Sequence, residues 1–300
     1  MSEAYGAFAD VYEYLMDNVP YDEWFERIRE LLMKNGIRDG IIAELGCGTG
    51  AMTRRLSAAG YDMIGIDASP DMLEHAREYT DAGDEEADRN MGLEEDHPGD
   101  DETDRNMGLE EGHNGKPEAG DGREILYLLQ DMRSFELYGT VRAVVCCCDS
   151  INYITDPEEV GEVFRLVNNY LDPEGLLIMD FHTPYYYGSV LKERTIAEVR
   201  EDVAMIWENE EAEDGMHRLW LTLFQETEDG RYERIEEMHE QRGYTPKQLR
   251  ELAEQAGLTE ICFYDGYTKN PVTERSERIV MTARECGKSA ELRKNQVTSE

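Results

Sequence analysis

The chain has 300 residues, and 40% of them are hydrophobic, which is enough to bury one large α/β core. Its formal net charge of −37 repels polyanions, and nucleic acids are bound mainly through Lys and Arg, so a large RNA or DNA substrate is not expected. Because no apolar run approaches ~20 residues and the six cysteines form no C-x-x-C pair, we expect a cytoplasmic protein without a membrane span or a metal centre.

The first 40 residues predict an N-terminal helical cap. Apolar residues at helical spacing indicate helices over Asp10–Met16 and Tyr21–Asn35. In the second of these, Trp24, Phe25 and Ile28 fall on one side, so this helix is expected to pack against a core.

Strands and helices then begin to alternate. The apolar run Ile41–Leu45 predicts a buried strand, and Ala51–Ala59 predicts a helix after a glycine turn. Tyr61–Asp67 predicts the next strand. Ser69 and Pro70, at the start of "SPDMLEHARE", are typical of a helix N-cap and first turn.

An acidic insertion over residues 81–122 interrupts the alternation. It contains 16 Asp or Glu, only 3 Lys or Arg, and the segment "DRNMGLEE" twice, at 88–95 and 104–111. Such a composition buries too little apolar surface to offset the entropy of ordering it, so we predict a disordered loop.

The alternation resumes after the insertion. Apolar runs predict strands over Glu124–Leu129, Val141–Cys147 and Leu176–Phe181. A helix is expected over Pro157–Leu171, and "DPEG" at Asp172–Gly175 is typical of a turn. Strands that alternate with helices predict a parallel sheet with helices on both faces.

A second kind of pattern follows. Polar and apolar residues alternate between Ile196 and Arg242, and "EDG" at 228–230 is typical of a hairpin turn, so an antiparallel sheet is predicted here. The α/β pattern returns with a helix over Thr245–Ala256 and strands over Thr259–Tyr264 and Arg278–Ala283. The predicted units are the cap (1–40), the α/β domain (41–184 and 244–285), the antiparallel β insertion (185–243) and a disordered tail (286–300).

The glycine turn in "IIAELGCGTGAMTRRL" fits two kinds of nucleotide cofactor. Gly46, Gly48 and Ala51 match the dinucleotide pattern G-x-G-x-x-G/A, whereas Gly46, Gly48 and Gly50 match the G-x-G-x-G loop of methyltransferases. Asp67, at the end of the second strand, suits the ribose hydroxyls of either cofactor and does not separate the two hypotheses.

Four motifs together give the chain a resemblance to class I S-adenosylmethionine-dependent methyltransferases. They are "AELGCGTG", "GIDASPDML", "QDMRSF" and "CCCDSINYI". The resemblance covers most of Tyr5–Ala283 and implies a Rossmann-like seven-stranded methyltransferase sheet whose final strand is reversed. It favours S-adenosylmethionine over a dinucleotide as the cofactor.

The resemblance also implies a set of cofactor-binding residues. It places the glycine loop at the methionine part of S-adenosylmethionine, Asp67 at the ribose, Met72 and Asp131 at adenine, and Cys148 beside the methionine part. The full set is Tyr12, Glu44, Gly46, Cys47, Gly48, Gly50, Asp67, Ala68, Met72, Asp131, Met132, Cys148 and Asp149.

Candidates for catalysis and acceptor binding lie elsewhere. His182 and His239 are candidate general bases, and Tyr12 or Tyr14 is expected to approach the sulfonium, whose positive charge favours an aromatic ring. The antiparallel insertion resembles the sheet that walls the pocket of glycine and sugar N-methyltransferases. The expected acceptor-binding residues are Asn152, Tyr153, Arg242 and Tyr244.

The leading hypothesis is a methyltransferase that acts on nitrogen or oxygen of a small-molecule acceptor. One alternative is an NAD-dependent oxidoreductase, although "QDMRSF" has no natural role there. Another is a non-enzymatic regulator or assembly factor that binds S-adenosylmethionine and uses its acidic insertion to bind a basic protein.

Overall fold

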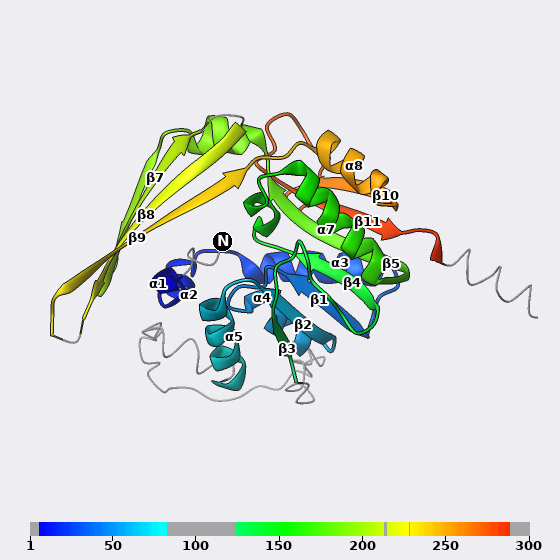
Figure 1. Cartoon of the computed structure of the whole chain (residues 1–300), viewed down its shortest axis with the longest axis horizontal. Helices are drawn as coiled ribbons and strands as arrows, with labels where there is room; N and C mark the ends of the chain where they lie inside the picture. Colours follow the sequence, from blue (N-terminus) through cyan, green and yellow to red (C-terminus); the bar gives the residue numbers. More distant parts are fainter. Residues whose placement is uncertain (1–5, 83–123, 213–214, 228, 289–300) are drawn as a thin grey trace, which may run out of the picture.

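Two β-sheets organise the computed structural model, which describes residues 6–82, 124–212, 215–227 and 229–288 (Figure 1). The larger sheet contains β1 (Ile41–Leu45), β2 (Asp62–Asp67), β3 (Leu126–Leu129), β4 (Val141–Cys146), β5 (Leu171–His182), β10 (Leu258–Asp265) and β11 (Arg278–Glu285). Its strand order is β10-β11-β5-β4-β1-β2-β3. The predicted α/β class, with a seven-stranded sheet and a separate antiparallel sheet, is confirmed.

Helices cover both faces of the seven-stranded sheet. On one face lie α3 (Tyr21–Lys34), α4 (Ala51–Ala58) and α5 (Pro70–Ala82), and on the other lie α7 (Pro157–Tyr170) and α8 (Pro246–Gln255). Each helix buries one apolar side against the strands. Because both faces of the sheet are covered, its central strands are nearly continuous apolar runs.

The strand directions bring several loops to one edge of the sheet. β1 pairs in parallel with β2 and β4, β2 pairs in parallel with β3, and β4 pairs in parallel with β5. β11 runs antiparallel between β5 and β10, as the expected reversed final strand does. Ligands of such sheets bind outside the carboxyl ends of the parallel strands, so this edge is the place to look for a site.

The smaller sheet is antiparallel throughout. It consists of β6 (Thr195–Val199), β7 (Val203–Glu211), β8 (Met216–Glu226) and β9 (Tyr232–Arg242) in that order. The predicted hairpin joins β8 to β9, where Thr227 and Arg231 are bonded through their main chains at 2.8 Å.

The N-terminal segment packs against the smaller sheet. It forms two short helices, α1 (Gly6–Ala9) and α2 (Tyr12–Leu15), where the sequence predicts one helix over Asp10–Met16. Eleven apolar residues gather between cap and sheet: Phe8, Val11, Tyr12, Tyr14, Leu15, Val203, Met205, Trp207, Leu221, Leu223 and Ile235. This contact places α1 and α2, the first part of the predicted cap, between the two sheets (Figure 1).

Several boundaries differ by a few residues from the sequence prediction, and three of the differences change its interpretation. β5 begins at Leu171 and includes the "DPEG" segment, where Glu174 has φ +64° and the register against β4 shifts. α5 continues to Ala82, so the first two residues of the expected disordered loop are helical. The expected tail is ordered at its start, because Nζ of Lys288 donates to the carbonyls of Asn168, Asn169 and Leu171.

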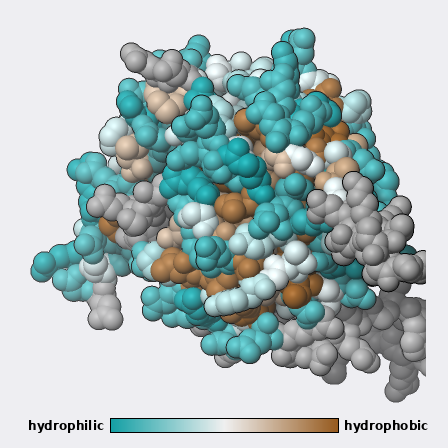
Figure 2. All heavy atoms as spheres, turned by 45° about the vertical axis from the view of Figure 1, so that its right-hand side comes forward, coloured by the Kyte–Doolittle hydropathy of each residue, from teal (hydrophilic) through white to brown (hydrophobic). Residues whose placement is uncertain are grey.

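The face in Figure 2 is largely hydrophilic, with hydrophobic residues confined to smaller areas. In the described part of the chain, every helix is too short or too polar to cross a membrane. The same ranges hold no group of three or more His, Cys, Asp or Glu arranged to bind a metal ion. Most of the predicted acidic insertion, residues 83–122, lies outside the described residues.

Candidate functional site

A cavity opens at the carboxyl ends of β1, β2 and β4. It is lined by Tyr12, Tyr21, Glu44, Gly46, Cys47, Gly48, Thr49, Ala51, Met52, Asp67, Ala68, Ser69, Met72, Gln130, Asp131, Met132, Cys147, Cys148, Ser150, Tyr153 and Ile154. Residues from all four sequence motifs therefore line the same cavity. Among the predicted cofactor residues, Gly50 and Asp149 do not line the cavity.

The glycine loop has a backbone that side chains would disrupt. The N–H groups of Gly46 and Cys47 both donate to the carbonyl of Ile66, which fixes the turn after β1. Gly46, with φ +66°, leaves no room for a Cβ atom, because one would lie 2.6 Å from Cβ of Ser150. Gly50, with φ +81°, precedes α4, and a Cβ atom at this residue would lie 2.6 Å from the hydroxyl oxygen of Tyr127. The loop thus brings bare backbone and a helix start to the cavity wall.

Asp67 ends β2 and ties that strand to the glycine loop. One of its carboxylate oxygens accepts the N–H of Gly48 at 2.8 Å, and the other accepts the N–H of Ser69 at 2.9 Å. Burial raises the pKa of Asp67, while these backbone donors oppose the shift. Ser69 caps α5 by accepting the N–H of Met72, so the expected N-cap is present.

Glu44 is an acid buried directly below the loop. Only 2% of it is exposed, and it accepts a hydrogen bond from the hydroxyl of Thr53 on α4. Burial raises the pKa of Glu44 to about 8. The side chain is therefore largely a neutral acid near pH 7.

Asp131 lies in the turn after β3 and lines the cavity. Burial alone would raise its pKa, but the ion pair with Arg133, at 2.6 Å, lowers it. Arg133 also pairs with Glu159 on α7 at 3.0 Å. This ion-paired cluster fixes the turn that carries Asp131 and Met132 into the cavity.

The chain reverses after β4 through two strained residues. Cys148 and Asp149 have φ values of +56° and +52°, which non-glycine residues rarely adopt. The N–H of Asp149 donates to Asp180 at 2.7 Å, which holds the turn in place. Burial, followed by the charge of Asp180, raises the pKa of the Cys148 thiol well above its usual value, so this group is not a ready nucleophile.

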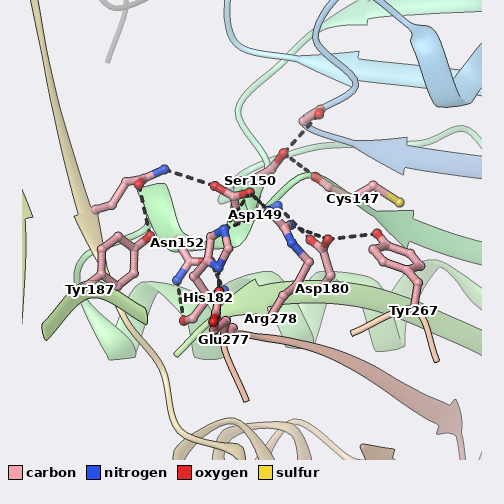
Figure 3. A network of polar contacts seen from close by, with 12 residues as sticks. Cys147, Asp149, Ser150, Asn152, Asp180, His182, Tyr187, Tyr267, Glu277 and Arg278 are labelled. Carbon is pink, nitrogen blue, oxygen red and sulfur yellow. Dashed lines mark hydrogen bonds and ion pairs between the residues drawn. The ribbon is translucent and has the colours of Figure 1, made fainter. Parts of the chain in front are cut away.

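A buried polar network supports this turn (Figure 3). Arg278, at the start of β11, donates to Asp149 at 2.7 Å and to Asp180 at 2.5 Å. The hydroxyl of Tyr267 donates to Asp180 at 2.8 Å. The sequence prediction missed Arg278, Asp180 and Tyr267, because each is a single polar residue on or beside an apolar strand, and only the folded sheet brings them together.

His182 belongs to this network and does not line the cavity. Its Nε2 lies 2.8 Å from Nη2 of Arg278, its Nδ1 lies 3.2 Å from the carbonyl of Glu277, and its ring stacks on Tyr186 at 3.7 Å. Burial and then the charge of Arg278 lower the pKa of His182 to about 3. Its predicted role as a general base stays a prediction that these surroundings do not favour.

His239, the other candidate base, lies on β9 behind the cavity wall. Its Nδ1 is hydrogen-bonded to the hydroxyl of Tyr153 at 3.4 Å, and Tyr153 lines the cavity. Its Nε2 lies 3.3 Å from the carboxylate of Glu237, which sequence analysis did not identify. The alternating pattern of β9 did place both residues on a strand, but gave no sign that this face is buried.

The N-terminal cap contributes directly to the cavity. Tyr12 lines it, and Glu13 accepts a hydrogen bond from the hydroxyl of Thr49 in the glycine loop. Tyr14 lies elsewhere, with its ring under the guanidinium of Arg200 at 4.6 Å. Of the two tyrosines considered for the sulfonium, only Tyr12 lines the cavity, and its role there stays a prediction.

Three of the predicted acceptor-binding residues are engaged with the backbone. Asn152, in the 3-10 helix η1 (Ser150–Tyr153), donates to the carbonyls of His182 and Arg242. The guanidinium of Arg242 donates to the carbonyl of Thr155, and the hydroxyl of Tyr244, which is fully buried, donates to the carbonyl of Ile154. These contacts join η1 to β5 and β9, and only Tyr153 of the predicted acceptor set reaches the cavity.

Comparisons with known proteins agree with this geometry. A family model described as "Methyltransferase domain" matches residues 17–262. YqeM of Bacillus subtilis strain 168, a protein named only as an inferred methyltransferase, is 29% identical over 93% of this chain and 96% of its own length.

Solved structures share the fold. An S-adenosylmethionine-dependent methyltransferase from Clostridium acetobutylicum is similar with a TM-score of 0.72, at 24% identity, over 94% of this chain and 99% of that one. The sugar N-methyltransferase KedS8 from a Streptoalloteichus species is similar with a TM-score of 0.68, at 16% identity, over 96% of this chain and 94% of its own.

Proposed function

The chain belongs to the S-adenosylmethionine-dependent methyltransferases, and from this premise we propose that it methylates nitrogen or oxygen of a small-molecule acceptor. The observation that carries the proposal is the part of the cavity wall that two tyrosines form. There the cavity is closed by Tyr12 of the cap and Tyr153 of η1, and Tyr153 is backed by His239 of the smaller sheet. We propose that the methyl group to be transferred points toward Tyr12 and Tyr153, so that only a small acceptor reaches it.

The residues of the cavity fit S-adenosylmethionine. Gly46 and Gly48 line the cavity with bare backbone, and the carboxylate of Asp67 stands at the end of β2 where ribose hydroxyls are expected. We propose that Met72 and Asp131 hold the adenine end and that Cys148 and Tyr12 border the methionine end. When bound, the cofactor supplies a methyl group made electrophilic by its positively charged sulfur.

The smaller sheet has a buried polar face that lies behind Tyr153 and does not itself line the cavity. The inner face of the smaller sheet carries five buried polar residues: Asn209, His217, Glu237, His239 and Gln241. Such a surface suits a small polar acceptor better than an apolar one. The likeness to a sugar N-methyltransferase points the same way, although it shows only a shared fold.

The other hypotheses receive less support. The family is one of methyltransferases, which disfavours an NAD-dependent oxidoreductase and a protein without activity. A basic protein partner for the acidic insertion stays a prediction. A pull-down with and without residues 81–122 tests it.

Two measurements test the proposed function. Calorimetry is expected to show binding of S-adenosylmethionine and S-adenosylhomocysteine but not of NAD. Transfer of a labelled methyl group is then compared for glycine, glucosamine and catechol as small acceptors, with tRNA and histones as macromolecular ones. Label that enters only tRNA or histones contradicts a small-molecule acceptor.

A further inference from the structure

A line of three polar side chains runs from the smaller sheet to the cavity. It begins at Glu237 on β9, passes through His239 two residues further along the same strand, and ends at Tyr153 in η1. The carboxylate lies 3.3 Å from Nε2 of His239, and Nδ1 of His239 is bonded to the Tyr153 hydroxyl at 3.4 Å. Of the three, only Tyr153 lines the cavity.

The surroundings favour one order of donors and acceptors. The side chains of Glu237 and His239 are 6% and 0% exposed, so both are shielded from water. The backbone N–H of Phe8 donates to one oxygen of Glu237 at 3.1 Å, which favours the charged carboxylate. Nε2 of His239 lies 3.3 Å from this carboxylate but outside hydrogen-bond geometry, so it is the nearby negative charge that favours a proton on Nε2. Nδ1 is then the acceptor for the Tyr153 hydroxyl.

Aromatic rings hold the imidazole in this orientation. Trp207 is stacked near it at 6.4 Å, Phe8 meets it edge-on at 6.3 Å, and Tyr153 meets it edge-on at 5.9 Å. Because the ring is packed on several sides, it cannot rotate freely to exchange its two nitrogens. Long hydrogen bonds of this kind often tighten when a substrate binds.

We propose that Glu237, His239 and Tyr153 form a proton relay that serves methyl transfer, an inference that rests on the proposed small-molecule acceptor. The relay selects an acceptor that must lose a proton, namely an amine with N–H or a hydroxyl. Tyr153 is the catalytic residue because it faces the reacting atoms. His239 is the proton store, and Glu237 is a positioning residue.

The step balances without a further reagent. The lone pair of the acceptor forms the new bond to the methyl carbon, and the electron pair of the carbon–sulfur bond that breaks stays on sulfur. The oxygen of Tyr153 takes the proton that the acceptor releases, while its own proton passes to Nδ1 of His239. The positive charge that leaves sulfur is thereby matched by one on the imidazole, which the carboxylate of Glu237 stabilises.

The first test reads the tautomer and needs no acceptor. Two-bond 15N–1H correlation spectra of the full chain with S-adenosylhomocysteine are recorded, and His239→Gln identifies the resonance among the six histidines. The relay requires a proton on Nε2 and none on Nδ1. In Glu237→Gln the amide NH₂ faces Nε2, so the proton is expected to move to Nδ1. A wild-type proton on Nδ1 or on both nitrogens, or an unchanged tautomer in Glu237→Gln, overturns the relay.

The second test reads turnover with glycine or glucosamine as the acceptor. Tyr153→Phe and Glu237→Gln are expected to lower kcat by about 10²-fold or more, with the Kd for S-adenosylhomocysteine within about twofold. Glu236→Gln is the matched control, because Glu236 is the adjacent residue and its side chain is exposed. An unchanged kcat in Glu237→Gln, or an equal loss in Glu236→Gln, overturns the relay. If the wild-type protein methylates neither probe, the choice of acceptor fails while the tautomer still decides the relay.

Discussion

At the scale of single residues, Asp67 is the side chain on which the cavity most directly depends. Its two oxygens accept backbone N–H groups on both sides of the cavity floor. Asp67→Ala is expected to weaken S-adenosylmethionine binding by about 10- to 100-fold, because hydrogen bonds to a charged group contribute about 1.5–3 kcal/mol. Calorimetry measures the change. Asp62→Asn, at the exposed start of the same strand, is the control, and an equal loss in that variant contradicts the assignment.

Gly50 allows a second prediction, about stability. Gly50→Ala places a methyl group 2.6 Å from the Tyr127 hydroxyl at a residue with φ +81°. The left-handed backbone costs about 1–2 kcal/mol for a side-chain-bearing residue, and the close contact adds to it. Gly60→Ala has φ +97° but open space, so it measures the backbone cost alone. Urea unfolding is expected to show the larger loss for Gly50→Ala, and equal losses would mean that the contact contributes nothing.

Glu44 makes stability depend on pH in a defined direction. Burial raises its pKa to about 8 from the usual 4.5, so the folded state holds a proton that the unfolded state has released. The contribution of Glu44 is therefore complete below pH 4.5 and is lost as the pH rises toward 8. Compared with Glu44→Gln, the wild-type protein is expected to lose about 1 kcal/mol per pH unit in this window. Urea unfolding at pH 5, 6, 7 and 8 checks this, and a difference that does not vary with pH contradicts it.

More of the predicted cofactor residues than of the predicted acceptor residues line the cavity, for a physical reason. The glycine loop, Asp67 and Asp131 each follow a strand at short range, so local spacing determines where they lie. Arg278 and Glu237 act through partners far away in the chain, and nothing near them in the sequence distinguishes them from surface charges.

At the scale of elements, the cap is the part whose attachment is most easily tested. Phe8 is 2% exposed and packs edge-on against Tyr12, Trp207 and His239. Loss of a buried Phe side chain costs about 3–5 kcal/mol, so in Phe8→Ala the cap is expected to open at least about 100-fold more often. Hydrogen exchange of the α2 amides measures the opening.

The control for the cap is an aromatic residue on the outer side of the same sheet. Trp220 is 45% exposed, so Trp220→Ala is expected to leave exchange in α2 unchanged. Faster exchange in both variants would mean that the sheet as a whole, and not the contact of Phe8, holds the cap.

The elements themselves follow closely from local patterns. β1 has the bounds that its apolar run predicts, and α8 begins after Thr245, whose side chain forms a capping box with Gln248. The cap helix is the clearest difference, because the segment from Gly6 to Leu15 is too short to be stable by itself and its shape is set by packing against the smaller sheet.

At the scale of the whole molecule, the net charge of −37 predicts a response to salt. Like charges repel one another in the compact state, and salt screens that repulsion. The free energy of unfolding is therefore expected to increase between 20 and 200 mM NaCl, as measured by thermal or urea unfolding. Sucrose of equal osmolality is the control, since it leaves charge interactions unscreened. A decrease with NaCl would show that attractive ion pairs outweigh the repulsion.

The late position of β11 in the chain affects when the turn after β4 can be stabilised during synthesis. The guanidinium of Arg278 pairs with a carboxylate that lies 129 residues earlier, and with Asp180, which lies 98 residues earlier. During synthesis on a ribosome, Asp149 in the turn after β4 and Asp180 on β5 therefore emerge long before Arg278, their only shared cation among the described residues. Until β11 inserts between β5 and β10, two neighbouring carboxylates repel each other at the edge of the cavity. We therefore expect the turn at Cys148 and Asp149 to reach its final form only after β11, the last strand among the described residues, has been added.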